Sequence, residues 1–144
     1  MTALDSMGVR ELVAALELEP DPHAGWSRES VDAGGRARSV LHLLGVGDCL
    51  EWHRVGGASE TWHHLAGGPL ALTLSPNGHD ASAHRLGRAL PTGDALLLIV
   101  SAGHWRTAEP LGEWTLVART LAPAQATRED APPGWRPVPR EFSA

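Results

Sequence analysis

The first segment of the chain has apolar residues that recur every three to four positions. These residues are Val9, Leu12, Val13 and Leu16. They share one face of a helix, and Asp5 or Ser6 precedes them as an N-cap. The spacing predicts a helix over about residues 7–17, because Pro20 and Pro22 prevent its continuation.

Beyond residue 25 the pattern changes to short apolar runs that glycine and proline separate. The runs that predict strands are Trp26–Val31, Ser39–Leu44, Leu50–Val55, Thr61–Ala66, Leu70–Leu74, His84–Leu86, Leu96–Val100, Thr107–Ala108 and Trp114–Leu121. Many short strands with such turns are typical of a β-sandwich or barrel, not of alternating βα units. The sequence predicts an all-β fold in one domain over residues 1–123. Residues 124–144 are rich in proline and predict an extension that is extended or partly disordered.

Composition and charge narrow the class of protein. The 144 residues carry a net charge of −5 and no basic stripe, so we expect no nucleic-acid partner. No run approaches the ~18 apolar residues of a membrane span and none resembles a signal peptide, so we expect no membrane partner. Cys49 is the single cysteine, which excludes an intramolecular disulfide and a zinc site built on paired cysteines. A cytoplasmic location fits this composition.

Tryptophan and histidine are abundant and often adjacent, since the chain has six Trp, eight His and no Tyr. The densest segment is residues 52–67. Strand side chains alternate between two faces, so Glu60, Trp62 and His64 share one face and His63 points to the other. This clustering is the first sign of a site.

His53 lies on the preceding strand, before a turn at Gly56 and Gly57. We expect this turn to lay the two strands side by side and to bring the His53 imidazole within contact distance of the Glu60 carboxylate. An imidazole beside a carboxylate suits a site that holds a divalent metal or one that acts as an acid/base pair. His53 and Glu60 are therefore the predicted catalytic residues.

Several short stretches follow one another along the chain: Gly25-Trp26, Arg28-Glu29, Trp52-His53-Arg54-Val55, Glu60 with Trp62-His63, Gly68-Pro69-Leu70, Ala102-Gly103 with Trp105, and Trp114-Thr115-Leu116-Val117. In this order they resemble a small cupin subfamily, cupin-5 or domain of unknown function 985, over about Leu12 to Pro123. The spacing from His53 through Glu60 to Gly67 also looks like the first cupin motif. The resemblance implies a double-stranded β-helix, or jelly-roll barrel, and a homodimer that shares edge strands.

The chain departs from metal-binding cupins at two of the four ligand positions that the resemblance implies. Val55 stands where the first motif has its second histidine, and Arg106 stands where the second motif has a histidine. A guanidinium donates no lone pair and its charge opposes a divalent cation. We therefore expect no cofactor. A divalent metal on the predicted catalytic pair is the alternative, with His64 or His104 as replacement ligands.

Further side chains are candidates for contact with a ligand in the barrel. Arg28 suits a carboxylate or phosphate but could instead bridge a nearby glutamate, and Arg106 has the same two interpretations. Trp62 and Trp105 could stack on a planar or sugar ligand or pack in the core. The predicted ligand-binding set is Arg28, Trp62, His63, His64, His104, Trp105 and Arg106.

Three functions are compatible with these residues. The first is an enzyme of small-molecule or secondary metabolism, in which His53 acts as acid or base, Glu60 orients it, and Arg28 or Arg106 holds an anionic group. Its reaction would be an epimerisation, isomerisation, cyclisation or elimination. The second is a barrel that binds or senses a small molecule without turnover. The third is a metal-dependent oxygenase, which the two missing ligands disfavour.

Overall fold

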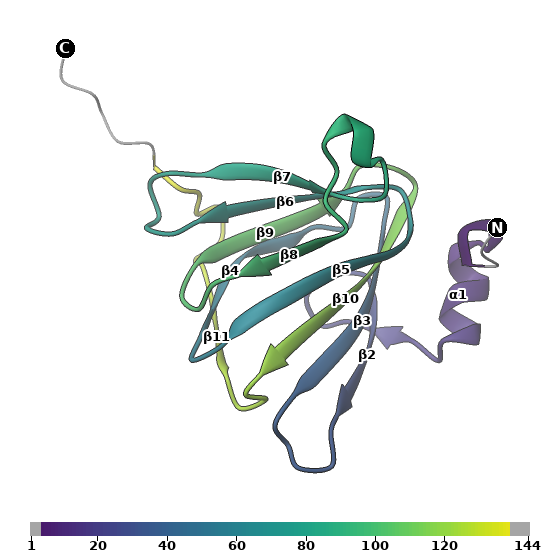
Figure 1. Ribbon diagram of the computed structural model, residues 1–144, viewed down its shortest axis with the longest axis horizontal. Coiled ribbons are helices and arrows are strands. Elements are labelled where there is room, and N and C mark those ends of the chain that lie inside the picture. The colour runs from purple at the N-terminus through teal and green to yellow at the C-terminus, as the bar shows by residue number, and fades with distance from the viewer. Residues whose placement is uncertain (1–3, 139–144) are drawn as a thin grey trace.

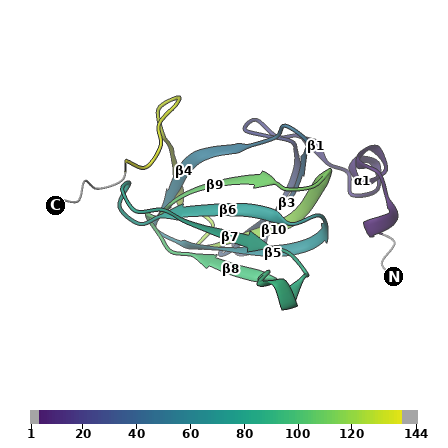
Figure 2. The ribbon, with the colours of Figure 1, turned by 90° about the horizontal axis from the view of Figure 1, so that it is seen from above.

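The computed structural model describes residues 4–138 and consists of two antiparallel β-sheets that face each other (Figures 1 and 2). Sheet A has the strand order β1-β2-β3-β10-β5-β8, and sheet B has the order β11-β4-β9-β6-β7. The strands are β1 (Glu19–Pro20), β2 (Trp26–Val31), β3 (Arg38–Gly45), β4 (Leu50–Gly56), β5 (Ser59–Gly67), β6 (Leu70–Ser75), β7 (Ser82–Leu86), β8 (Leu97–Val100), β9 (Trp105–Pro110), β10 (Trp114–Ala122) and β11 (Thr127–Asp130). The predicted all-β fold is confirmed.

The helix α1 (Val9–Ala15) lies at one end of the sandwich, opposite the C-terminal segment (Figure 2). Leu12 is fully buried in a cluster with Leu43 and Leu116, which belong to the outer face of sheet A. The helix is shorter than predicted because Glu17 adopts a left-handed backbone, with φ of 53°. Short 3-10 turns occupy Leu4–Ser6 and Leu90–Thr92. None of the helices between residues 4 and 138 is long and apolar enough to cross a membrane.

Between the two sheets, one half of the interior is a close-packed apolar core. Its fully buried members come from both sheets and are Leu44, Leu50, Trp62, Leu70, Leu72, Leu86, Val100, Ala108 and Val117. Burial of these side chains is the main favourable contribution to the fold. Trp62 lies where this core meets a group of polar side chains, so the core forms one wall of the candidate site.

Two strands were not predicted, and both are short. β1 pairs only two of its residues with β2. β11 falls within the proline-rich segment and pairs with β4, with Arg128 opposite Val55 and Asp130 opposite His53. After β11 the chain crosses the outer face of sheet B as far as residue 138. The last part of the predicted extension, residues 139–144, lies outside the described residues.

The expected pairing of the strands that carry His53 and Glu60 is wrong. β4 pairs with β9 and β11 in sheet B, whereas β5 pairs with β10 and β8 in sheet A. The turn at Gly57, whose φ is 87°, therefore joins two sheets instead of closing a hairpin within one. His53 and Glu60 face each other across the interior, and another side chain has room to lie between them.

Candidate functional site

Six polar or aromatic side chains meet between the sheets, and we call them the interior cluster. They are His42 of β3, His53 of β4, Glu60 and Trp62 of β5, Arg106 of β9 and Arg119 of β10. Arg119 keeps 8% of its surface exposed, and the other five keep no more than 1%. Charged side chains are seldom buried to this extent unless they are paired. The interior cluster is thus a buried group of polar side chains between two otherwise apolar sheet faces.

Glu60 is held by donors on both of its oxygens. Its Oε1 accepts hydrogen bonds from Trp62 Nε1 at 2.7 Å and from Arg106 Nη1 at 3.0 Å, and its Oε2 lies 3.2 Å from Arg119 Nη2. Burial by itself would raise the pKa of Glu60. The charges of Arg119 and Arg106 and the two hydrogen bonds outweigh this effect and hold the pKa below its ordinary value. Glu60 is therefore an anion that is fixed in place.

Arg119 lies between the two histidines and Glu60. Its Nη1 is 3.2 Å from His42 Nδ1, its Nη2 is 3.4 Å from His53 Nε2, and the guanidinium carbon stands 4.6 Å from the centre of the Trp62 ring. Within the described chain, no hydrogen bond or ion pair joins His53 directly to Glu60. The predicted His53–Glu60 contact is replaced by a contact through a guanidinium.

On each imidazole, the ring nitrogen that faces away from Arg119 contacts a backbone carbonyl oxygen, and this contact determines where the proton lies. His42 Nε2 lies 2.7 Å from the carbonyl oxygen of Ala24, and His53 Nδ1 lies 2.9 Å from that of Glu51. A carbonyl only accepts, so these nitrogens carry the hydrogens, and the nitrogens that face Arg119 present lone pairs to it. Both histidines are therefore neutral acceptors for the Arg119 guanidinium.

Burial and neighbouring positive charge keep the two imidazoles neutral. Burial, followed by the charges of Arg119 and Arg128, lowers the pKa of His53 to about 2. Burial and the charge of Arg119 also lower the pKa of His42. An imidazole with so low a pKa is a weak base near neutral pH, so His53 needs a change in its surroundings before it can accept a proton.

The interior cluster carries more positive than negative charge. Two guanidinium groups and one carboxylate, with both histidines neutral, leave a formal charge of +1. Burial lowers the pKa of Arg106, although Glu60 opposes this effect. The Nε atoms of Arg106 and Arg119 are buried and have no hydrogen-bond partner among residues 4–138. Unpaired buried donors beside excess positive charge suit an anion.

These residues do not fit a divalent metal. Both oxygens of Glu60 accept from cationic or indole donors, and the lone pairs of His42 and His53 point at Arg119. No group of three or more His, Cys, Asp or Glu within the described chain has the arrangement of a metal site. A cation placed here would meet two guanidinium groups.

The other predicted site residues lie in different places. Arg28 is half-exposed on β2 and pairs with Glu17 at 2.8 Å, outside the sandwich. His63 is exposed on the outer face of sheet A, and His64 is buried, with Nε2 2.9 Å from the Gly68 carbonyl oxygen. The alternation predicted for β5 is confirmed by this burial pattern.

Two further candidates come from the start of β9. His104 precedes the strand and accepts a hydrogen bond from Arg106 Nη2 at its carbonyl oxygen, at 3.0 Å. Trp105 lies on the outer face of sheet B, where the Arg54 guanidinium carbon is 4.6 Å from its ring centre. The structure thus places Arg106 in the interior cluster and Trp105 on the opposite face of the sheet.

Arg119 and His42 are the members of the cluster that sequence reasoning missed. Arg119 could have been found from strand alternation, because it shares a face with the buried residues Val117 and Leu121. A charged residue at a core-facing position of an apolar strand needs a partner. His42 occupies a core-facing position on β3, next to Leu43 on the other face, but neither a motif nor a spacing singles it out.

Comparisons with known proteins agree with this architecture. The family model described as cupin superfamily (DUF985) matches residues 10–129. A solved structure from Shewanella oneidensis is 25% identical, with a TM-score of 0.76, and the match covers 87% of this chain and 85% of that one. A hypothetical protein from Leishmania major is 20% identical, with a TM-score of 0.69, covering 79% and 80%. No curated protein matches the sequence.

More distant structures share the fold over part of their length. Oxalate decarboxylase is 16% identical, with a TM-score of 0.64, and the match covers 80% of this chain but 30% of that one. The 11S globulin procruciferin from Brassica napus is 10% identical, with a TM-score of 0.63, and the match covers 78% of this chain and 28% of that one. An enzyme and a storage protein at similar structural distance show that the jelly-roll fold does not fix the activity.

Proposed function

The chain belongs to the DUF985 family of the cupin superfamily, and we propose that it binds a small molecule with an anionic group, which Arg119 receives. The observation that carries the proposal is the excess positive charge of the interior cluster, with the buried Nε of Arg119 lacking a partner among the described residues. Arg119 is also the member of the cluster that keeps some exposed surface. A carboxylate is the ligand group that best matches a guanidinium.

Arg128 supports entry of an anion at the same end of the sandwich. Register places it on the inner face of β11 opposite Val55, and its charge contributes to the low pKa of His53 and Arg106. Asp130 accepts a hydrogen bond from Arg128 Nε at 2.7 Å, so this second guanidinium is partly neutralised. Arg119 therefore stays the principal anchor, with Arg128 at the rim.

The experiment compares carboxylates with their uncharged amides. Formate, oxalate and benzoate, with formamide, oxamide and benzamide as controls, are titrated into the protein at constant ionic strength, and heat release is measured. We expect at least one carboxylate to bind about tenfold more tightly than its amide, because the charge-assisted hydrogen bonds are lost in the amide. Equal affinity for every acid and its amide would argue against the proposal.

Matched arginine variants separate the site from the rest of the surface. Arg119→Gln removes the proposed anchor. Arg85→Gln removes an arginine on β7 that is paired with Asp94 and lies outside the interior cluster. Carboxylate binding should be lost in the first variant and kept in the second. If both variants bind alike, Arg119 does not receive the ligand.

A second candidate function is acid/base catalysis by His53, with Glu60 as the residue that fixes Arg119 and thereby His53. The observation that favours it is the His53 Nε2 lone pair, which faces Arg119, the proposed anchor of the anion. A bound anion beside His53 would raise its pKa and make it a stronger base. Nuclear magnetic resonance of the His53 ring, with and without the carboxylate that binds best, tests this step. If the His53 titration is unchanged, acid/base catalysis by His53 is contradicted and only the binding function remains.

The protein is also proposed to form a homodimer through the outer face of sheet A. On this face Leu97 is 44% exposed and Ile99 is 64% exposed, and register places them beside His63 and Thr61. Exposed apolar side chains such as Leu97 and Ile99 can pack against the same face of a second copy. Sedimentation should show a dimer that Ile99→Asp converts to a monomer, while Val46→Asp, in an exposed turn, leaves it a dimer.

A further inference from the structure

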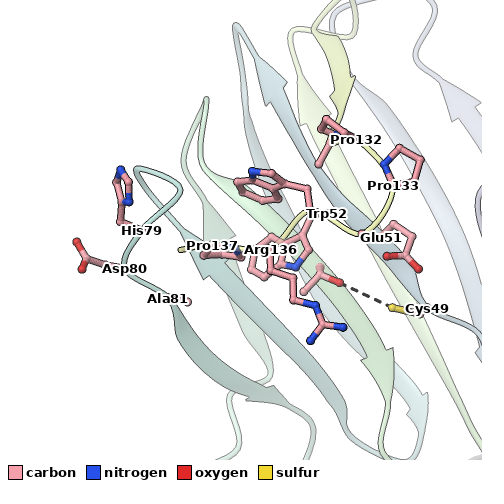
Figure 3. Close-up of a pocket in the computed structure, with 14 residues that line it drawn as sticks. Cys49, Glu51, Trp52, His79, Asp80, Ala81, Pro132, Pro133, Arg136 and Pro137 are labelled. Carbon is pink, nitrogen blue, oxygen red and sulfur yellow. Dashed lines mark hydrogen bonds between the residues drawn. The ribbon is translucent and has the colours of Figure 1, made fainter. Parts of the chain in front are cut away.

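A groove of about 1110 Å³ lies on the outer side of sheet B, away from the interior cluster (Figure 3). Its floor includes Cys49, Glu51 and Thr107 from the segment around β4 and from β9, and Trp52 forms part of its wall. The opposite side of the groove is formed by residues of the segment 131–138, which we call the strap. A groove of this size has room for a small molecule, since such sites usually measure about 300–1000 Å³.

The strap is attached to the sheet at both ends. At one end the Ala131 amide donates to the Trp52 carbonyl oxygen at 3.0 Å. At the other, the Val138 amide donates to the Gly78 carbonyl oxygen at 2.9 Å, and His79 Nδ1 lies 2.9 Å from the Val138 carbonyl oxygen. Three prolines further restrict the strap backbone. The strap therefore has a fixed position along one side of the groove.

Two tryptophans, Trp52 and Trp135, line this groove, and a third, Trp105, packs against Trp135. The Trp135 ring centre is 4.6 Å from that of Trp105, and it is 5.7 Å from that of Trp52, with the Trp135 and Trp52 planes at 84°. All three rings stay partly exposed. Nearly perpendicular indole rings beside an open groove give a flat ligand ring one surface to stack on and another to abut.

Two opposite charges line the groove without being paired. Glu51 and Arg136 are both exposed, and within residues 4–138 neither forms an ion pair with the other or with any other residue. The other carboxylate of the groove, Asp80, already accepts a hydrogen bond from Asn77 at 2.7 Å. Glu51 and Arg136 are thus available for the two charges of a zwitterion.

The groove depends on a part of the chain outside the common domain. The family match ends at residue 129, and the strap begins at residue 131. Trp135 and Arg136 therefore lie beyond the residues that the family model matches. This site is independent of the proposed function, which uses the opposite face of β4.

We propose that this outer groove binds a zwitterionic aromatic molecule of the amino-acid class. Its ring packs against Trp52 and Trp135, its carboxylate pairs with Arg136, and its ammonium group pairs with Glu51. Neither charge of such a ligand need be buried, so the affinity comes from ring stacking together with two charge-assisted contacts.

The test uses three probes that share a ring and differ in charge: phenylalanine, phenylacetate and phenylethylamine. Each is titrated into the full-length protein, and the six indole N–H signals are followed by nuclear magnetic resonance. We expect phenylalanine to bind about tenfold more tightly than either singly charged probe, because each of those lacks one charge-assisted contact. The Trp52 and Trp135 signals should move, and that of the interior Trp62 should not.

Variants assign the contacts. Glu51→Gln should remove the preference for phenylalanine over phenylacetate, and Arg136→Gln should remove the preference over phenylethylamine. Trp135→Leu should weaken binding of all three probes, while Trp26→Phe, packed near α1, should weaken none. Equal affinity for the three probes, or no movement of the Trp52 and Trp135 signals, overturns the proposal. Arg119→Gln should leave this binding intact, which separates the outcome from that of the proposed function.

Discussion

The two faces of β4 present polar side chains under opposite conditions. On the inner face, His53 belongs to a cluster in which the imidazoles, the carboxylate and the indole all have partners. On the outer face, Trp52 is half-buried and Glu51 has no ion-pair partner among the described residues. Burial demands hydrogen-bond partners, whereas solvent makes them optional. The same strand therefore supports a buried, hydrogen-bonded site with excess positive charge and a more open, aromatic one.

The largest expected difference between the two faces comes from neutralising one carboxylate in the interior cluster and one on the outer face of β4. Glu60→Gln leaves two buried guanidinium groups without a counter-charge and should lower the free energy of unfolding by about 3–5 kcal/mol. Glu51→Gln alters an exposed group and should change it by no more than about 0.5 kcal/mol. Urea denaturation of both variants gives the two values. Similar losses in the two would show that the interior cluster is not the electrostatic centre of the fold.

The acid dependence of stability provides the next largest effect. The pKa of His53 is about 2 in the folded protein and near 6.5 when unfolded. Between these values the unfolded chain binds a proton that the folded chain does not, so stability falls as the pH drops below 6.5. A single such group lowers the free energy of unfolding by about 2 kcal/mol between pH 6.5 and pH 5.

His42, whose pKa is also lowered, acts in the same direction. His53→Gln should therefore flatten the dependence of unfolding free energy on pH, measured by urea denaturation from pH 7 to pH 5. His63→Gln, on the outer face of sheet A, is the matched control and should keep the wild-type slope. An identical slope in wild type and His53→Gln would contradict the neutral, buried state of His53.

The smallest expected effect concerns the strap. Trp135→Leu removes two aromatic contacts that are partly exposed and should lower the free energy of unfolding by about 1 kcal/mol. Hydrogen exchange should show faster exchange for the Val138 amide, while the amides of β5 and β10 stay protected. Loss of protection throughout sheet A would mean that the strap stabilises the whole sandwich and not only the groove.

Local alternation was the most reliable guide that the sequence offered. It placed Glu60, Trp62 and His64 on the inner face of β5 and His63 on the outer face, because the period of two holds wherever a strand is regular. The local sequence pattern did not predict which strands pair with each other. β4 and β5 are joined by a short turn, yet they belong to different sheets, since their pairing depends on strands far along the chain.

The composition of the candidate site was predictable only in part. His53, Glu60 and Arg106 were singled out, but Arg119 was not, although strand alternation placed it on the core face of β10. The outer groove was not predicted, because β11 and the strap lie in a proline-rich segment whose position depends on contacts at Trp52 and Gly78. Such long-range contacts leave no periodic signal in the sequence.

Between residues 52 and 55 the side chains of β4 alternate: Trp52 and Arg54 face outward, and His53 and Val55 face the interior. The two sites consequently depend on the same alternation of side chains along β4. The register shift between Leu50 and His53 lets two consecutive side chains, Glu51 and Trp52, both line the outer groove. Deleting either of them would regularise the strand and leave a single side chain for the groove, while His53 would still face inward.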